Sequence, residues 1–305
     1  AILAPFYFLF FGLMLSDAAY GLILTTLCAI ILKKYKPEGT THRMIKMFMF
    51  CGLSTFMWGA LFGGWFGNFF TVAAKTFFGK EFVIKPLWFD PLSEPMRLLV
   101  VSLILGAIHL FVGMGVQAYM DIKDGRPLDA LFDIGLWYLL LIGIVLFAFG
   151  GKLGEGAVGI GKIMAIVGAV GILLTGGRKK KGIFGKLTGG LGSLYGITSY
   201  LSDVLSYSRL LALGLATGVV AQVFNTLGSL AGGGIAGSIL LIVVFAFGTV
   251  FNIAINALGA FVHSCRLQYV EFFGKFYTGG GRPFAPFERK TKYIKILKEG
   301  NDNVK

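Results

Sequence analysis

The chain has 305 residues, of which 56% are hydrophobic and only 14% are charged, and its mean hydropathy is +0.78. Because the apolar residues come in long blocks, this composition excludes an ordinary soluble domain and predicts a polytopic membrane protein. The formal net charge of +13 does not indicate a nucleic-acid partner, since the basic residues lie in short segments between apolar blocks and in the tail. Basic residues in such places set membrane orientation.

Seven apolar blocks follow one another along the chain. They cover residues 2–32, 44–70, 98–119, 131–149, 158–174, 191–230 and 235–276. Only helices or closed barrels span lipid, and these blocks are too long and too little alternating for barrel strands. The sequence therefore predicts an all-α, polytopic membrane helical bundle.

The first block contains a turn signal at its midpoint, Ser16-Asp17-Ala18-Ala19-Tyr20-Gly21. An Asp and a Gly favour a turn there, which would give two short helices that cross as a hairpin. We favour this hairpin, over residues 1–34, because it yields about eight transmembrane helices. A single crossing would yield seven.

Basic segments at residues 33–46 and 178–186 and the tail at 279–305 are expected on the cytoplasmic side. The expected organisation is peripheral transmembrane helices over 1–190 (the hairpin and four more), two long helices over 191–278, and a basic cytoplasmic tail. Each long helix has about 40 residues, roughly 60 Å at 1.5 Å per residue, which is twice the thickness of a hydrocarbon core. Both should therefore be strongly tilted.

Arg209 lies inside the first of these long helices. A charge in mid-bilayer costs about 2.5–3.5 kcal/mol or more, so it indicates a functional site. Residues three, four and seven positions away along the helix include no acid, and Asp203 lies about 240° around the helix. The counter-charge is therefore expected from another segment or another chain.

The second long helix carries polar residues at helical spacing. His263 and Arg266 share a face, and Gln268, Glu271 and Lys275 form a second stripe. Two interpretations of Glu271 and Lys275 stay open: an i,i+4 ion pair near the interface, or a part of an ion path. On the first long helix Ser206 and Asp203 are weaker candidates for that path.

Two further polar residues lie in apolar surroundings. His109 is expected to be hydrogen-bonded in the core, and Asp17 to cap or turn the first hairpin. The sequence contains no nucleotide-binding, zinc or serine-hydrolase motif. We therefore expect no cofactor, no metal and no ATP site in this chain.

Four stretches resemble the membrane domain of the stator subunit of V-type and A-type rotary ATPases, called subunit a or subunit I. They are PFYFLFFGLMLSDAAYGLIL, LILGAIHLFVG, SYSRLLALGLA and HSCRLQYVEFFGKFYTGGGRPFAPF. The resemblance runs nearly end to end and looks nearest to bacterial subunits. It implies eight membrane helices and an N-terminal cytoplasmic domain that lies outside this sequence. It also implies that Arg209 is the essential arginine and Arg266 the second one, and that His263 and Glu271 border the ion path.

The resemblance further implies a non-catalytic stator subunit that couples rotation to H⁺ or Na⁺ transport. The implied partners are a ring of c/K-type proteolipid subunits, peripheral stalks, other ATPase subunits and membrane lipid, with no nucleic acid. The implied location is a bacterial plasma membrane, with the C-terminus in the cytoplasm. Eukaryotic members carry an acid, a histidine and an acid where this chain has Tyr195, Thr217 and Asn256.

Two other functions would fit a helical membrane protein. A secondary transporter would show inverted repeats and broken helices in matching places, and we find no convincing repeat. A passive anchor would pair both arginines within the bundle. The direction in which Arg209 points should separate these alternatives.

Overall fold

The computed structural model describes residues 2–79, 84–152, 155–178, 183–230, 234–277 and 279–281, together with 284 and 287. Within these ranges the secondary structure is entirely helical. Seven helices are long and apolar enough to cross a membrane, and a shorter apolar helix covers Leu3–Leu15. The predicted polytopic membrane bundle is therefore confirmed, and the predicted tail at 279–305 lies mostly outside the described residues.

The helices follow the apolar blocks closely. In chain order they are α1 (Leu3–Leu15), α2 (Ala18–Tyr35), α3 (Gly39–Phe62), α4 (Phe69–Phe78), α5 (Pro95–Lys123), α6 (Pro127–Ala130), the π-helix η1 (Leu131–Gly135), α7 (Leu136–Phe149), the short 3₁₀ helix η2 (Gly150–Lys152), α8 (Glu155–Thr175), α9 (Ile183–Tyr195), α10 (Ile197–Ser206), α11 (Ser208–Ser229), α12 (Ile235–Arg266), the π-helix η3 (Leu267–Phe272) and the 3₁₀ helix η4 (Phe273–Lys275).

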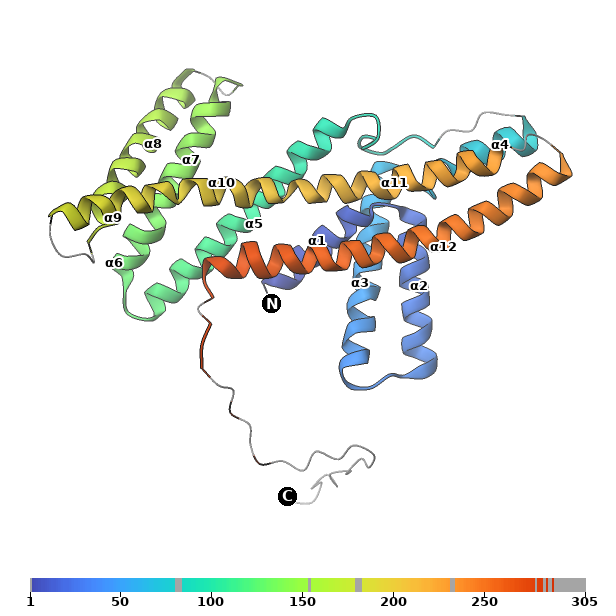
Figure 1. The fold of residues 1–305 in the computed structure, drawn as a ribbon, viewed down its shortest axis with the longest axis horizontal. Coiled ribbons are helices and arrows are strands. Elements are labelled where there is room, and N and C mark those ends of the chain that lie inside the picture. Colours follow the sequence, from blue (N-terminus) through green and yellow to red (C-terminus); the bar gives the residue numbers. More distant parts are fainter. Residues whose placement is uncertain are drawn as a thin grey trace, which may run out of the picture.

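The predicted turn in the first block is present. Ser16 adopts a left-handed conformation (φ 35°) at the end of α1, and Asp17 caps the start of α2 by accepting hydrogen bonds from the N–H groups of Ala19 and Tyr20. The chain reverses direction between α1 and α2 (Figure 1). At 13 residues α1 is about 20 Å long, which is shorter than a full bilayer span.

Small residues let α3 pack closely against the first hairpin. A Cβ on Gly59 would lie 2.0 Å from the backbone nitrogen of Ala18, and one on Gly21 would lie 2.4 Å from the backbone nitrogen of Phe56. Close backbone approach at small residues is a common way for helices to associate in lipid. These contacts hold α2 closely against α3.

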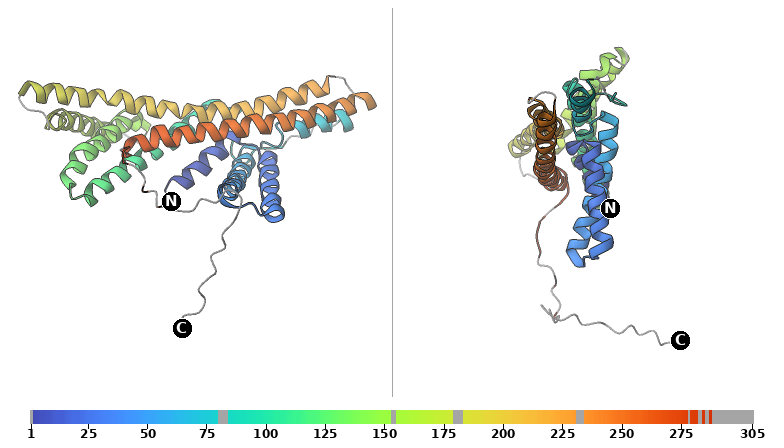
Figure 2. Two further views of the ribbon diagram at one scale, coloured as in Figure 1. Left: turned by 60° about the horizontal axis from the view of Figure 1, so that its bottom comes forward. Right: turned by 90° about the vertical axis from the view of Figure 1, so that its right-hand side faces the viewer.

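The last two long helices form a layer of their own. Segments α9, α10 and α11 run almost end to end, and α12 returns antiparallel beside α11, so that the pair crosses the remaining helices (Figures 1 and 2). The apolar stretches Thr188–Ser229 and Gly237–Lys275 contain 42 and 39 residues. The predicted length of these two helices is confirmed, and this layer carries the charged residues in question.

Two local features were missed at the sequence level. Helix α4 begins at the end of the second apolar block and continues beyond it, and its ten residues are too few to cross a bilayer. At the other end of the molecule Arg178 pairs with Asp129 and, at 3.0 Å, with Asp133. These ion pairs connect the end of α8 to the start of the α6–η1 segment.

Candidate functional site

The candidate site lies where α10 ends, α11 begins and α12 passes into the π-helix η3. Two turns of the backbone depart from α-helical geometry here. Tyr207 separates α10 from α11 by a tighter turn, in which its C=O accepts a bond from the N–H of Leu210 at 3.0 Å. The wider π-helix follows Arg266 directly. Such π-helical turns are frequent at functional sites.

Arg209 faces Glu271 across these two helices. The Arg209 Nη1 atom lies 3.8 Å from Glu271 Oε1, which is an ion pair without a hydrogen bond. The same Nη1 atom is buried and has no hydrogen-bond partner among the described residues, and the Arg209 side chain is 24% exposed. The guanidinium is therefore held near a carboxylate but is not fully paired with it.

The absence of an acid on Arg209's own helix was correctly read from the sequence. The sequence left the counter-charge to another segment or another chain, and Glu271, on another segment of the same chain, lies 3.8 Å away. Sequence spacing within one helix carries no information about a residue 62 positions further along the chain. The long distance and the unpaired nitrogen leave Arg209 able to interact with a second anion.

Glu271 is as buried as a core residue, with 3% exposure. The Ser206 hydroxyl donates a hydrogen bond to its Oε1 atom, whereas its Oε2 atom has no partner among the described residues. Gln268, one turn earlier on η3, is 2% exposed, and both polar atoms of its side chain also have no partner there. Buried polar atoms without partners mark places where water or an ion is accommodated.

Lys275 pairs with Asp203 rather than with Glu271. Its ammonium contacts the Asp203 carboxylate and lies 4.0 Å from the centre of the Tyr200 ring. Of the two interpretations left open for Glu271 and Lys275, the i,i+4 ion pair is not formed, because the π-helix and the 3₁₀ turn between them change the helical register. The actual pair joins the first long helix to the end of the second.

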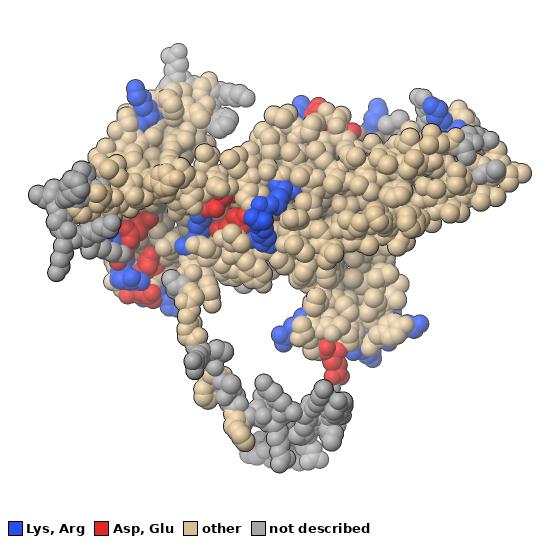
Figure 3. All heavy atoms as spheres, viewed as in Figure 1, with Lys and Arg blue, Asp and Glu red and all other residues tan. Residues whose placement is uncertain are grey.

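Arg266 and His263 lie toward the outer face of the helix pair. Arg266, at the end of α12, is exposed, and His263 is half-buried with an unpaired Nδ1 atom and lies near both Arg209 and Arg266. Figure 3 shows one group of charged side chains in the middle of this face, over α10 and the end of α12, while other charged side chains lie near the ends of the remaining helices. The two arginines that the sequence singled out are thus brought into one region.

His109 is confirmed as a hydrogen-bonded core residue. Its Nδ1 atom lies 2.7 Å from the Tyr207 hydroxyl, and both side chains are fully buried. Tyr207 was missed at the sequence level. Its position two residues before Arg209 was visible, but nothing in the spacing indicated the helix break that it occupies.

A second, neutral polar network ties α11 and α12 to the first hairpin. The buried amide of Asn252 donates to the Tyr20 hydroxyl at 3.0 Å and to the Thr217 carbonyl at 3.1 Å, and Asn256 donates to Asn252. Two of the positions at which this chain departs from the eukaryotic pattern therefore contribute to packing, while the third, Tyr195, is 75% exposed.

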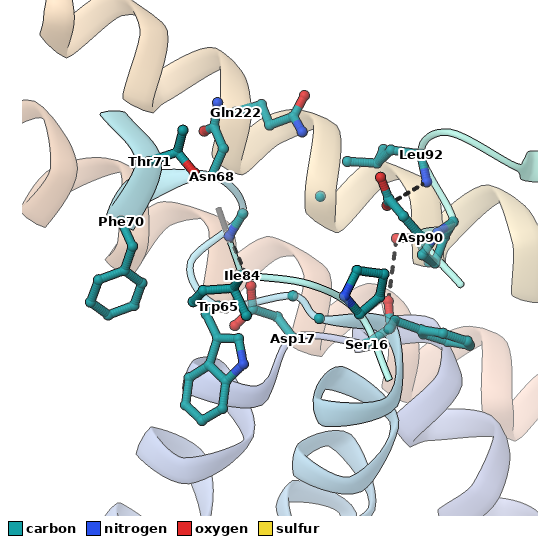
Figure 4. A pocket seen from close by; sticks show the side chains of 18 residues that line it. Ser16, Asp17, Trp65, Asn68, Phe70, Thr71, Ile84, Asp90, Leu92 and Gln222 are labelled. Carbon is teal, nitrogen blue, oxygen red and sulfur yellow. Dashed lines mark hydrogen bonds between the residues drawn. The ribbon is translucent and has the colours of Figure 1, made fainter. Parts of the chain in front are cut away.

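A cavity of about 220 Å³ lies beyond Arg209, toward the opposite end of α11 from Glu271. Asp17, Asn68 and Gln222 border it, as Figure 4 shows, and Gly214 and Gly218 of α11 form part of its wall. Asp17 is 3% exposed, and besides its cap bonds it accepts hydrogen bonds from the N–H groups of Phe66 and Gly67. The prediction that Asp17 turns the first hairpin is confirmed. Among the described residues no cluster of His, Cys, Asp and Glu suits a metal ion.

The fold and the site together define a class: an integral membrane protein whose two longest apolar stretches hold a partly buried, incompletely paired ion pair. Comparison with known proteins shows a resemblance to one family. Residues 197–289 match the family model described as the V-type ATPase 116 kDa subunit family. This segment, which contains Arg209, Arg266 and Glu271, is similar to V/A-type ATPase subunits, known as subunit a or subunit I.

Its relatives include several subunits named A-type ATP synthase subunit I. The proteins of Methanocaldococcus jannaschii and Thermococcus kodakarensis are 35% and 36% identical over 96% and 97% of this chain. The V-type ATP synthase subunit I of Borreliella burgdorferi is 25% identical over 94% of it. The expected nearness to bacterial subunits therefore has no support. The chain spans a little under half the length of these relatives, 44–48%.

Proposed function

We propose that this chain is the membrane part of the stator subunit of a V/A-type rotary ATPase. In this proposal the face that carries Arg209 and Arg266 lies against a ring of proteolipid rotor subunits. Arg209, assisted by Arg266, removes the transported ion from rotor carboxyl groups, which couples rotation to H⁺ or Na⁺ translocation. The N-terminal cytoplasmic domain, the peripheral stalks and the cytoplasmic location of the C-terminus belong to the same proposal.

The observation that carries the proposal is the state of the Arg209 guanidinium. An arginine that serves only to stabilise a bundle is expected to make short, bidentate bonds to its carboxylate. Arg209 instead stands 3.8 Å from Glu271, with one nitrogen unpaired and about a quarter of the side chain exposed. The Arg209 guanidinium can therefore attract a second carboxylate as well.

The chemistry follows from electrostatics. At an effective dielectric constant of 20, two unit charges about 4 Å apart interact by about 4 kcal/mol. A neutral rotor carboxyl group that arrives beside Arg209 would be stabilised as its carboxylate by such an amount, so its proton or sodium ion dissociates. The guanidinium stays protonated throughout, because arginine does not lose its proton in proteins, whereas a buried lysine can.

The released ion needs a polar route. Glu271 Oε2, the Gln268 amide and His109 Nε2 are buried and lack partners among the described residues. Polar atoms of this kind hold water when the space between them is large enough. We place one half of the ion route along this group, with Ser206 and Asp203 at its edge.

Arg266 and His263 then lie at the rotor-facing side. Arg266 is exposed at the end of α12, and His263 lies near both Arg266 and Arg209. A second positive charge beside the first widens the zone in which a rotor carboxylate stays ionised, and it repels cations that would otherwise pass directly between the two halves of the route.

Photo-crosslinking in the assembled enzyme tests the proposed orientation. Ala212 lies one turn beyond Arg209 on the same helix and is exposed, so benzoylphenylalanine placed there should form an adduct with the rotor subunit. Ile163 on α8 is 64% exposed and serves as the matched control, which should give adducts with lipid or with other subunits. Rotor adducts from Ile163 and none from Ala212 would refute the proposed orientation.

A further inference from the structure

One face of α5 contacts both halves of the charged site. Gly106, His109 and Gly113 recur at spacings of three and four residues, so they share a face of this helix. All three are buried. Gly106 contacts Tyr207, two residues before Arg209, and Gly113 contacts Phe272, the residue after Glu271. His109 contacts both.

The contact with Tyr207 is specific in shape and in hydrogen bonding. A Cβ on Gly106 would lie 2.4 Å from Cγ of the Tyr207 ring, so the ring needs a glycine beneath it. The Tyr207 hydroxyl is then held by His109 Nδ1 at 2.7 Å. Tyr207 is the residue between α10 and α11. Holding its side chain therefore fixes the direction in which the Arg209 side chain points from the start of α11.

The contact with Phe272 is a parallel stack. The His109 and Phe272 rings lie 4.5 Å apart with an interplanar angle of 4°. Beneath the same ring a Cβ on Gly113 would lie 3.2 Å from Phe272 Cδ2. Since Phe272 directly follows Glu271 on the π-helix, the stack fixes the position of the carboxylate.

We propose that His109 is a positioning residue that sets the separation of Arg209 and Glu271, by holding Tyr207 on one side and Phe272 on the other. This inference rests on the proposed function, because the 3.8 Å separation matters only if Arg209 must also attract a rotor carboxylate. If His109 were absent, the two helices would be free to close into a short ion pair, and Arg209 would no longer be available to the rotor.

The variants His109→Ala and His109→Asn separate positioning from packing. His109→Ala removes both contacts, whereas Asn retains a polar atom near the place of Nδ1 and so keeps the bond to Tyr207. We expect His109→Ala to lower the number of ions taken up per ATP hydrolysed by about tenfold, since a shift of about 1 Å at a reacting group has effects of up to about 100-fold. His109→Asn should recover more than half of the loss. Equal defects in both variants would overturn the proposal.

Tyr207→Phe serves as the second variant should His109→Ala not assemble. It removes one hydroxyl group and keeps the ring, so it should assemble and still lower the ion-to-ATP ratio. Ser102→Ala is the matched control: its buried hydroxyl lies on the same face of α5 and donates to the Leu98 carbonyl of its own helix. A wild-type ratio in Tyr207→Phe, or an equal loss in Ser102→Ala, would contradict the proposal.

A structural measurement keeps this inference separate from the proposed function. Electron cryo-microscopy of the Tyr207→Phe holoenzyme should show an Arg209–Glu271 distance shorter than in the wild-type enzyme. An unchanged distance refutes the positioning role even if Ala212 crosslinks to the rotor. A shortened distance without any rotor crosslink from Ala212 would instead refute the proposed function while the role of His109 in the fold stands.

Discussion

Asp17 and Glu271 are equally buried carboxylates, each 3% exposed, and the chain treats them in opposite ways. Asp17 accepts four backbone N–H bonds, from Ala19, Tyr20, Phe66 and Gly67, so both of its oxygens are satisfied. Glu271 receives one hydroxyl bond and a long ion pair, and one oxygen is unpaired. The first arrangement holds two turns together, whereas the second keeps a charge available.

This difference should appear most strongly in stability when Asp17 is removed. Asp17→Ala leaves two buried and two partly buried N–H groups without their acceptor, and we predict a loss of about 3–5 kcal/mol, measured by thermal unfolding of the purified protein in detergent. Asp17→Asn keeps one acceptor oxygen and should lose about half as much. A loss of stability below about 1 kcal/mol in Asp17→Ala would show that the carboxylate does not hold the two turns together.

The same hairpin should resist added volume. Gly59→Ala would place a methyl group 2.0 Å from the Ala18 nitrogen, so the α3 backbone must shift, at a cost of about 2–3 kcal/mol. Gly159→Ala on α8 is the control, because nothing lies within 4 Å of its Cβ position. Unfolding temperatures that fall equally in both variants would mean that close packing at Gly59 is not the cause.

Glu271 should show the reverse pattern. Glu271→Gln keeps a polar side chain beside Ser206 but removes the charge, and we predict about a 100-fold loss of ATP-driven ion uptake. It should lose less stability than Asp17→Ala, since the ion pair with Arg209 is long and the Arg209 side chain is 24% exposed. A variant that loses stability like Asp17→Ala while retaining uptake would reverse the roles assigned to the two carboxylates.

A smaller effect is expected where an ion pair is complete. Lys275→Met removes the partly buried pair with Asp203 and the contact with Tyr200, which should lower stability by about 1 kcal/mol. Arg97→Met removes an exposed pair with Glu94 and should have almost no effect in the same unfolding experiment. Equal effects would show that burial adds nothing to the Lys275 pair.

Most of the fold could be predicted from the sequence because lipid demands long apolar helices. The hairpin turn at Asp17 was also readable, since an Asp beside small residues favours a cap. Helix α4 was not, because ten residues are too few to stand out as a separate membrane-spanning block. The helix break at Tyr207 could not be predicted either, because no Gly or Pro marks it. The residues that contact Tyr207 lie on α5, about 100 residues earlier in the chain.

The site was predicted as a set of residues but not as a set of pairs. Arg209 and Glu271 were singled out by charge in an apolar run, which is a local signal. Their approach depends on the π-helix after Arg266 and on packing between two long helices, neither of which leaves a local pattern. The π-helix also explains why Lys275 pairs with Asp203 and not with Glu271, because a change of helical register moves a side chain to another face of the helix.

The central claim is that Arg209 acts on a rotor carboxylate rather than only on Glu271. Ion uptake per ATP hydrolysed, measured on the reconstituted holoenzyme with and without sodium, tests it with Arg209→Ala beside Arg126→Ala, an exposed arginine paired with Asp121 and Asp124. We predict an assembled Arg209→Ala enzyme with no coupled uptake and a wild-type ratio for Arg126→Ala. Coupled uptake by Arg209→Ala at a near wild-type rate would contradict the claim.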